Sequence, residues 1–289
     1  MHYRIPIIIA LLTTATTTMA IDLASLWDFN NPEVSEQRFR AKLEAATEDD
    51  KIVLQTQIAR TYCLRKDFLK AQEVLKSVAS DVPAAGSEAR TRYALELGRT
   101  YASAAHPPVL QTAESKTLAR ASYESALAIA KGANLDGLAI DAIHMLAFVD
   151  TSPADQLKWG QEALAVVEAS SQPEAKKWEA SVRNNVGYAL HQLGRFDEAL
   201  VQFKRAVVLR ERGTNAGSTR AAHWMVAWTF RALGRMEEAL EIQLRLEREC
   251  EAAKAPDRYV YEELEILYRA RGDEVRAKHY AGLANSVPS

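Results

Sequence analysis

The sequence predicts an all-α fold, a right-handed solenoid (superhelix) of about six stacked helix pairs. The octapeptide LGRFDEAL of residues 193–200 returns as LGRMEEAL at residues 233–240, forty residues later. Each copy follows a helix rich in small residues and precedes a second amphipathic segment. Near-identical segments at such a period indicate a repeat architecture, in which each unit buries its apolar face against its neighbours.

The composition is that of an ordinary folded chain. Of 289 residues, 48% are hydrophobic and 26% are charged, and the formal net charge is −2. Broad nucleic-acid binding is disfavoured, because it requires a basic surface that displaces counterions. The two cysteines, Cys63 and Cys250, fall in the first and fifth helix pairs, too far apart for a disulfide. We therefore expect two buried free thiols, which suits a reducing compartment.

Residues 1–20 have two interpretations. Arg4, a short apolar run over residues 5–12 and small residues before Ile21 fit a signal peptide cleaved after Ala20. Alternatively, Met19 is the true start and the protein is cytoplasmic. The apolar run is shorter than a membrane span requires, so no membrane span is expected there. We favour Met19 and the cytoplasm, with export to the periplasm as the alternative.

Residues 21–50 are predicted to form an N-terminal capping segment. Trp27 and Phe29 lie in an aromatic-rich stretch, and Pro32 opens a helix that carries Phe39 on its apolar stripe. A repeat array needs such a cap because its first unit lacks a neighbour on one side.

Residues 51–289 are predicted to form the array itself. The first pair covers residues 52–64 and 68–79, the third covers 138–149 and 154–169, and the fourth and fifth contain the two octapeptides. The second pair begins near Ser87, and Pro107 and Pro108 require a loop over residues 103–111 between its helices. The sixth pair ends near Ser286.

Small residues recur at equivalent places in these pairs. Gly187 and Ala227 lie where two helices are expected to cross, because a small side chain lets the backbones approach closely. Gly194 and Gly234 lie in the turns, where we expect a left-handed C-cap.

This spacing resembles that of the tetratricopeptide repeat family, over nearly everything after residue 50. The period of about 38–40 exceeds the usual 34 residues and is similar to the longer repeats of kinesin light chains. QTQIAR (55–60), DAIHML (141–146), KKWEASVRNNVGYALHQLG (176–194) and the region of residues 222–224 resemble a stand-alone tetratricopeptide family of bacteria and fungi. That narrower resemblance implies no assigned activity, and it implies a start near the LWDF segment, which supports Met19.

The family resemblance implies that the first helix of each pair lines a concave face on which peptides are held. The candidate peptide-binding residues on that face are Asn184, Asn185, Tyr188, His191, Trp224, Trp228, Arg231 and Arg269.

The two asparagines and the two tryptophans of this set each have a structural interpretation beside the binding one. The carboxamides of Asn184 and Asn185 can both donate to and accept from a peptide backbone, or they can make an inter-helix hydrogen bond instead. Trp224 and Trp228, one helical turn apart, form either an exposed anchor pocket or a packing contact between the fifth and sixth pairs.

A possible basic patch consists of Arg60, Arg92 and Arg99, suited to an acidic peptide or a phosphate group. The alternative, which we favour, is a solvated helix face in which these arginines pair with Glu96 and nearby acids.

The spacing of the histidines does not indicate a metal site or a catalytic site. His144, His191 and His223 fall in successive pairs, but none has the spacing of a metal site such as HxxxH or HExxH. Asp141 and His144 lie three residues apart on one helix, a spacing that suits acid–base work, yet no nucleophile accompanies them. We predict no catalytic residues, no metal and no cofactor.

The leading hypothesis is a non-enzymatic scaffold or adaptor that binds a protein or peptide on its concave face. The alternative is a small-molecule sensor, or less favourably an enzyme, with a polar pocket near His144, Asn184, His191 and Trp224.

Overall fold

The computed structural model describes residues 21–287, and these residues form α-helices and two short 3-10 turns, without a β-strand. The all-α prediction is therefore confirmed. No helix among residues 21–287 is both long and apolar enough to cross a membrane. Residues 1–20, which carry the two interpretations of the N-terminus, lie outside the described part.

The N-terminal cap consists of α1 (Leu23–Leu26) and α2 (Pro32–Leu43). Phe39 of α2 is fully buried in a cluster with Leu54 and Ile58 of the following helix. That helix begins at Glu48, three residues before the predicted start of the array at residue 51. The earlier start has an electrostatic reason, because three acidic residues in the first turn complement the positive end of the helix dipole.

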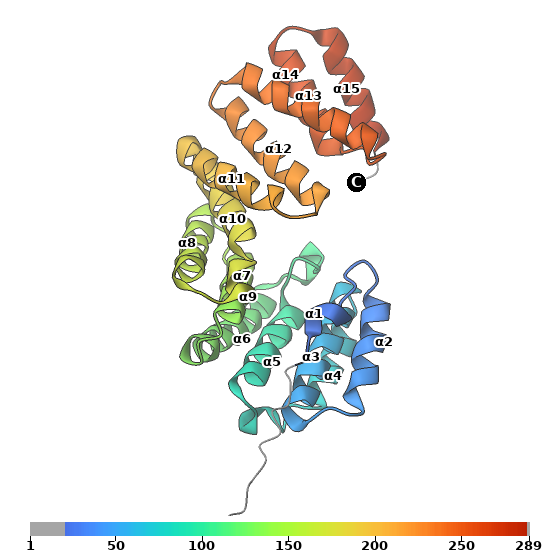
Figure 1. The fold of residues 1–289 in the computed structure, drawn as a ribbon, viewed down its shortest axis with the longest axis vertical. Helices are drawn as coiled ribbons and strands as arrows, with labels where there is room; N and C mark the ends of the chain where they lie inside the picture. The colour runs from blue at the N-terminus through green and yellow to red at the C-terminus, as the bar shows by residue number, and fades with distance from the viewer. Residues whose placement is uncertain (1–20, 288–289) are drawn as a thin grey trace, which may run out of the picture.

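The six predicted helix pairs follow in order (Figure 1). They are α3 (Glu48–Leu64) with α4 (Phe68–Lys76), α5 (Ser87–Tyr101) with α6 (Ala113–Gly132), α7 (Asp136–Val149) with α8 (Pro153–Ala169), α10 (Glu179–Gln192) with α11 (Phe196–Glu211), α12 (Ala216–Ala232) with α13 (Met236–Ala252), and α14 (Arg258–Ala270) with α15 (Glu274–Ser286). The short α9 (Pro173–Lys176) joins the third pair to the fourth. Helix α4 ends at Lys76, earlier than the predicted residue 79, and a 3-10 turn, η1 (Val82–Ala84), precedes α5.

The turns use left-handed residues, as predicted. Gly194 and Gly234 have φ of +73° and +76°, and Gly272 in the sixth pair has +77°. Lys66 has φ of 64° in the turn between α3 and α4, although it carries a side chain. The first pair therefore makes the same left-handed turn as the last three pairs, with a less suitable residue.

Small residues allow close helix crossings within the pairs. A Cβ atom added at Gly187 of α10 would lie 2.7 Å from the ring of Phe203 in α11. Gly98 of α5 faces the ring of Tyr123 in α6 in the same way. Each aromatic ring thus occupies the space that the missing side chain leaves open, and the close crossing predicted at Gly187 is present.

The insertion between α5 and α6 is a loop that contains one 3-10 turn, η2 (Pro108–Leu110). Its anchor is the buried His106, whose ring stacks on Phe68 of α4 with centroids 3.6 Å apart. The Nε2 of His106 also lies 3.2 Å from the carbonyl oxygen of Thr100. Burial lowers the pKa of His106 below its ordinary value, so the loop is held by a neutral ring.

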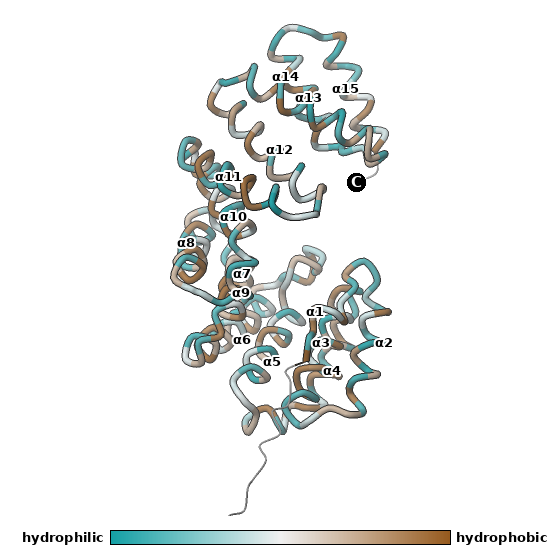
Figure 2. The backbone as a smooth tube through the Cα atoms, in the orientation of Figure 1, coloured by the Kyte–Doolittle hydropathy of each residue, from teal (hydrophilic) through white to brown (hydrophobic). Residues whose placement is uncertain are grey.

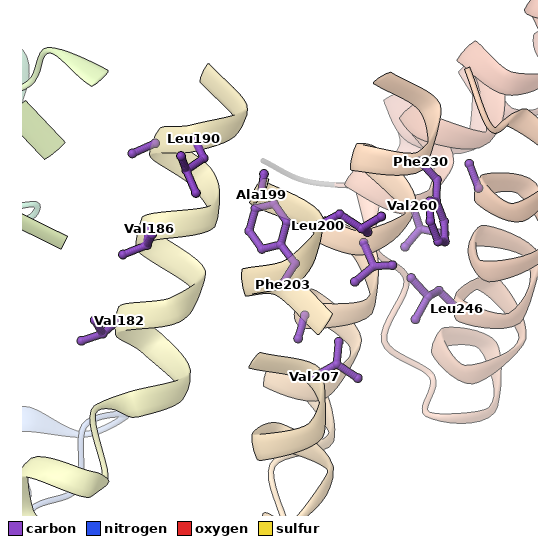
Figure 3. Packing of buried hydrophobic residues seen from close by; sticks show 14 of the residues in the cluster. Val182, Val186, Leu190, Ala199, Leu200, Phe203, Val207, Phe230, Leu246 and Val260 are labelled. Atoms are coloured by element: carbon purple, nitrogen blue, oxygen red, sulfur yellow. The ribbon is translucent and has the colours of Figure 1, made fainter. Parts of the chain in front are cut away.

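Hydrophobic and hydrophilic residues alternate along the helices (Figure 2), and the buried residues form several clusters along the array. Figure 3 shows buried residues of the fourth pair, where Val182, Val186 and Leu190 follow one another along α10 and Phe203 lies on the neighbouring α11. The helices form one curved array, with α10 toward the inner side of the curve and α8 and α11 toward the outer side (Figure 1). Both cysteines are buried and free, as expected.

Candidate functional site

Helix α10 presents two different sides. Val182, Val186 and Leu190 are buried in the core that α10 shares with its neighbours. Because these residues repeat with helical spacing, they define the buried side of α10, and Asn185 and Tyr188 lie outside it. Tyr188 is 42% exposed, and Asn185 is partly exposed.

Aromatic rings from three successive first helices meet on this side of α10. The ring of Trp228 on α12 stacks with Tyr188, His191 and Trp224, at centroid distances of 6.0, 3.4 and 5.7 Å. Trp224 donates a hydrogen bond of 3.1 Å from Nε1 to the carbonyl oxygen of Tyr259 on α14. Tyr259 itself is 65% exposed. We call these five residues the aromatic strip.

The structure combines the two alternatives for Trp224 and Trp228, an exposed anchor and a packing contact between the fifth and sixth pairs. Trp224 packs against the core that includes the fifth and sixth pairs, so it is partly a structural residue. Its neighbours Tyr188 and Tyr259 keep large exposed surfaces, so the strip is also open to solvent at both ends.

His191 contributes an uncharged ring to the strip. Burial, with a smaller contribution from Arg231, lowers the pKa of His191 to about 4. Its Nε2 is buried and has no hydrogen-bond partner among the described residues. His191 therefore acts as a neutral aromatic side chain at neutral pH, and it is not placed as a metal ligand.

A small pocket adjoins the strip between α7, α8 and α10. Its volume is about 150 Å³. The residues that line it are Ala147, Phe148, Gln156, Gly160, Asn185 and Tyr188. Tyr188 belongs to both the pocket and the aromatic strip, so the two features form one continuous surface.

The two asparagines differ in their surroundings. Asn185 lies with its Nδ2 3.2 Å from Nδ1 of His144 on α7, and this contact spans the gap between two first helices. Asn184 is partly exposed, and its side chain makes no hydrogen bond within residues 21–287. Asn185 thus makes the inter-helix hydrogen bond that was the alternative for this pair, while it also lines the pocket.

The predicted arginines of the groove are engaged in ion pairs. Arg231 makes two hydrogen bonds of 2.7 Å to the buried carboxylate of Glu263 on α14. Arg269 is exposed and pairs with Glu265 at 2.8 Å and with Glu274 at 3.4 Å. Both arginines are therefore already paired with acidic residues of the array.

The three arginines of the possible basic patch do not form one open, basic surface. Arg99 is buried and pairs with Glu96 and with Asp141, each at 2.5 Å, and Arg60 reaches Glu96 at 3.3 Å. Arg92 pairs instead with Glu88 on its own helix. The pairing with Glu96 that we favoured is present, but Arg99 is buried and does not lie on a solvated face, because acids on α5 and α7 neutralise it.

Asp141 is held in the same ion-pair network. Burial opposes its ionisation, but the adjacent Arg99 outweighs burial and keeps the pKa of Asp141 below its ordinary value. Asp141 is thus a charged partner of Arg99, and this position does not suit proton transfer with His144.

The histidines of successive pairs do not converge. His144 contacts Asn185, His191 stacks on Trp228, and His223 pairs with Glu211 at 3.0 Å. Within residues 21–287, no group of three or more His, Cys, Asp or Glu side chains is placed to hold a metal ion.

Two aromatic residues of this surface were not among the residues predicted from the sequence. Phe148 lines the pocket and is 39% exposed, and Tyr259 ends the aromatic strip. A signal for Tyr259 was available, since it lies outside the apolar stripe formed by Val260, Leu264 and Leu267 of α14.

The comparisons with known proteins agree with this architecture. Residues 178–248, which include α10 to most of α13, match the family model of the tetratricopeptide repeat. The match contains both octapeptides and most of the aromatic strip, and repeats of this kind generally mediate protein interactions.

Solved structures extend the tetratricopeptide fold to the remaining helix pairs. A signal transduction ATPase with numerous domains, which has a tetratricopeptide repeat sensor and comes from Pyrococcus horikoshii, aligns with a TM-score of 0.66 and 15% identity. The alignment covers 88% of this chain but only 38% of that one.

Two further structures align over most or all of their own length. BtubC (BKLC) from P. vanneervenii has a TM-score of 0.59 and 16% identity, over 81% of this chain and 93% of that one. A putative kinesin light chain with nearly identical repeats, from Podosopora anserina, has a TM-score of 0.54 and 17% identity, over 73% of this chain and 100% of that one. At these identities the likeness concerns the fold alone.

No curated protein matches the sequence. The narrower resemblance to a stand-alone family of bacteria and fungi stays a prediction.

Proposed function

We propose that this tetratricopeptide array is a non-enzymatic adaptor that binds an extended segment of a partner protein on its inner face. The observation that carries the proposal is the aromatic strip, continuous with the pocket across α7, α10, α12 and α14. Trp and Tyr side chains dominate protein interfaces, because they bury a large area with little loss of conformational freedom.

The size of the pocket favours a side chain over a free ligand. Pockets for small molecules usually enclose about 300–1,000 Å³. The pocket beside Asn185 has only about 150 Å³ and is bordered by the exposed rings of Tyr188 and Phe148. A volume of this size suits one apolar side chain of a longer segment, whose neighbouring residues would lie along the aromatic strip.

Binding can be tested without knowing the partner. A displayed library of random linear peptides is selected on the protein, and the affinity of the selected peptides is measured by fluorescence polarisation. Tyr188→Ala should weaken binding roughly 30-fold, as expected for an interface residue worth about 2 kcal/mol. Trp228→Ala should have a similar effect.

Phe29→Ala is the matched control, because Phe29 is an aromatic residue of the N-terminal cap with 60% exposure. It should leave the affinity unchanged. Selected peptides that bind equally well to the Tyr188 and Trp228 variants would show that the aromatic strip is not the binding surface.

A further inference from the structure

The contact between Asn185 and His144 has a defined polarity. The Nδ2 of Asn185, 3.2 Å from Nδ1 of His144, carries only hydrogens and must donate. His144 Nδ1 therefore presents its lone pair, and the ring is neutral with its proton on Nε2. The carbonyl oxygen of Asn185 has no hydrogen bond within residues 21–287, and Asn185 lines the pocket. The amide thus keeps its acceptor for a ligand.

The surroundings of His144 favour this neutral form. The ring lies against Phe148 and Trp178, with centroids 5.0 and 5.5 Å away. Burial is the main reason that the pKa of His144 is lowered.

Three charged groups also act on the pKa of His144. Asp141 on its own helix raises it, whereas Arg99 on α5 and Arg60 on α3 lower it. Asp141 is paired with Arg99, so the effects of these two charges on His144 oppose each other. Helix α10 contributes the neutral Asn185 to this contact.

We propose that His144 sets the hydrogen-bond polarity of the pocket by holding Asn185 with its carbonyl oxygen available to the bound segment. The pocket then selects a residue that offers a donor, namely a backbone N–H next to an apolar side chain. This inference rests on the proposed function, since it describes the chemistry of the segment bound there.

The same geometry makes binding sensitive to pH. A protonated His144 carries hydrogens on both ring nitrogens, so Nδ1 becomes a donor. Asn185 must then turn its amide to offer Oδ1 to His144, and its NH₂ group faces the segment. Two donors would oppose each other in the pocket. Loss of one such hydrogen bond corresponds to roughly three- to tenfold weaker binding.

The resting polarity can be tested in the free protein by nitrogen-15 NMR of the histidine rings, which distinguishes the two tautomers. The wild-type His144 should carry its proton on Nε2. Asn185→Asp replaces the amide by an acceptor, so His144 should become protonated on Nδ1, and its pKa should rise. Asn184→Asp is the matched control and should leave the tautomer unchanged, because Asn184 does not contact His144.

A wild-type His144 with its proton on Nδ1 would overturn the proposal. So would a tautomer that is the same in wild type and in Asn185→Asp. Both results are independent of whether any peptide binds, so they separate this inference from the proposed function.

The bound state is tested with a peptide selected from the random library. Replacing its backbone N–H groups one at a time by N-methyl groups should reveal one position at which affinity falls roughly three- to tenfold. Wild-type affinity should also fall over the pH range in which the His144 ring titrates. His144→Leu should lose this pH dependence, since its Asn185 is free to turn. An equal pH dependence in the wild type and the His144→Leu variant would contradict the proposal while leaving the proposed function intact.

Discussion

At the scale of single residues, the packing of a helix pair depends on where a side chain is missing. Gly187 allows α10 to lie directly against the ring of Phe203, and Gly98 does the same for Tyr123. Phe203 and Tyr123 are fully buried as a result. A methyl group at either glycine must displace a ring that has no free space around it, because protein interiors are close-packed.

Gly187→Ala should therefore lower the free energy of unfolding by about 1–3 kcal/mol, despite the better helix propensity of alanine. Thermal and denaturant unfolding followed by circular dichroism would measure this. The matched control is Gly282→Ala in α15, where an added Cβ meets no atom within 4 Å. It should stabilise the helix by up to about 1 kcal/mol. Equal effects at the two positions would contradict the proposed close crossing.

At the scale of the helix pair, the turn between the two helices contains a left-handed residue in four of the six described pairs. Glycine occupies this place in the last three pairs, and Lys66 occupies it in the first. The backbone N–H of Lys66 still caps α3 through a hydrogen bond of 3.0 Å to the carbonyl oxygen of Cys63. The first pair thus keeps the capping bond and adopts an unfavourable conformation to do so.

Lys66→Gly should raise the free energy of unfolding by about 1 kcal/mol, since glycine adopts a positive φ without steric cost. Asn134, with φ of 55°, offers a graded comparison. Asn134→Gly should stabilise less, because asparagine tolerates this conformation better than lysine does. Chemical denaturation would rank the variants, and a destabilising Lys66→Gly would show that the lysine side chain contributes more than its backbone costs.

At the scale of the whole molecule, each helix pair packs mainly on its neighbours in the chain, as in other repeat proteins. The N-terminal cap is part of this one-dimensional order, because Phe39 closes the first pair in the way that a preceding repeat would. A destabilising substitution at one end should consequently increase unfolding only in the neighbouring helices.

Phe39→Ala should cost about 3–5 kcal/mol at its site. Amide hydrogen exchange followed by mass spectrometry should then show faster exchange in α1 to α4 and unchanged exchange in α12 and α13. Phe203→Ala, at an equally buried ring of α11, should give faster exchange in α10 and α11 and unchanged exchange in α1 to α4. Uniformly faster exchange in either variant would indicate that the array unfolds as a single cooperative unit.

The fold was accessible from the sequence because a repeat is a local pattern. The octapeptides, the small residues at the crossings and the glycines of the turns specify each pair without reference to distant residues. The helices α10 and α12 of the candidate site followed from the same pattern. Boundaries such as Glu48 and Lys76 were less accurate, because they depend on caps and on the start of the next segment.

Only the tertiary structure decided which side chains meet across neighbouring pairs. Arg99 and Arg231 belong to helices predicted to line the groove, yet Asp141 and Glu263 on the next first helices neutralise them. The same spacing between helices joins Tyr188 to Trp228 and Asn185 to His144. Such contacts lie more than thirty residues apart in the chain, and they depend on how closely successive helices approach. The periodicity of the sequence determines which face of a helix is buried, whereas the curvature of the array determines what the other face meets.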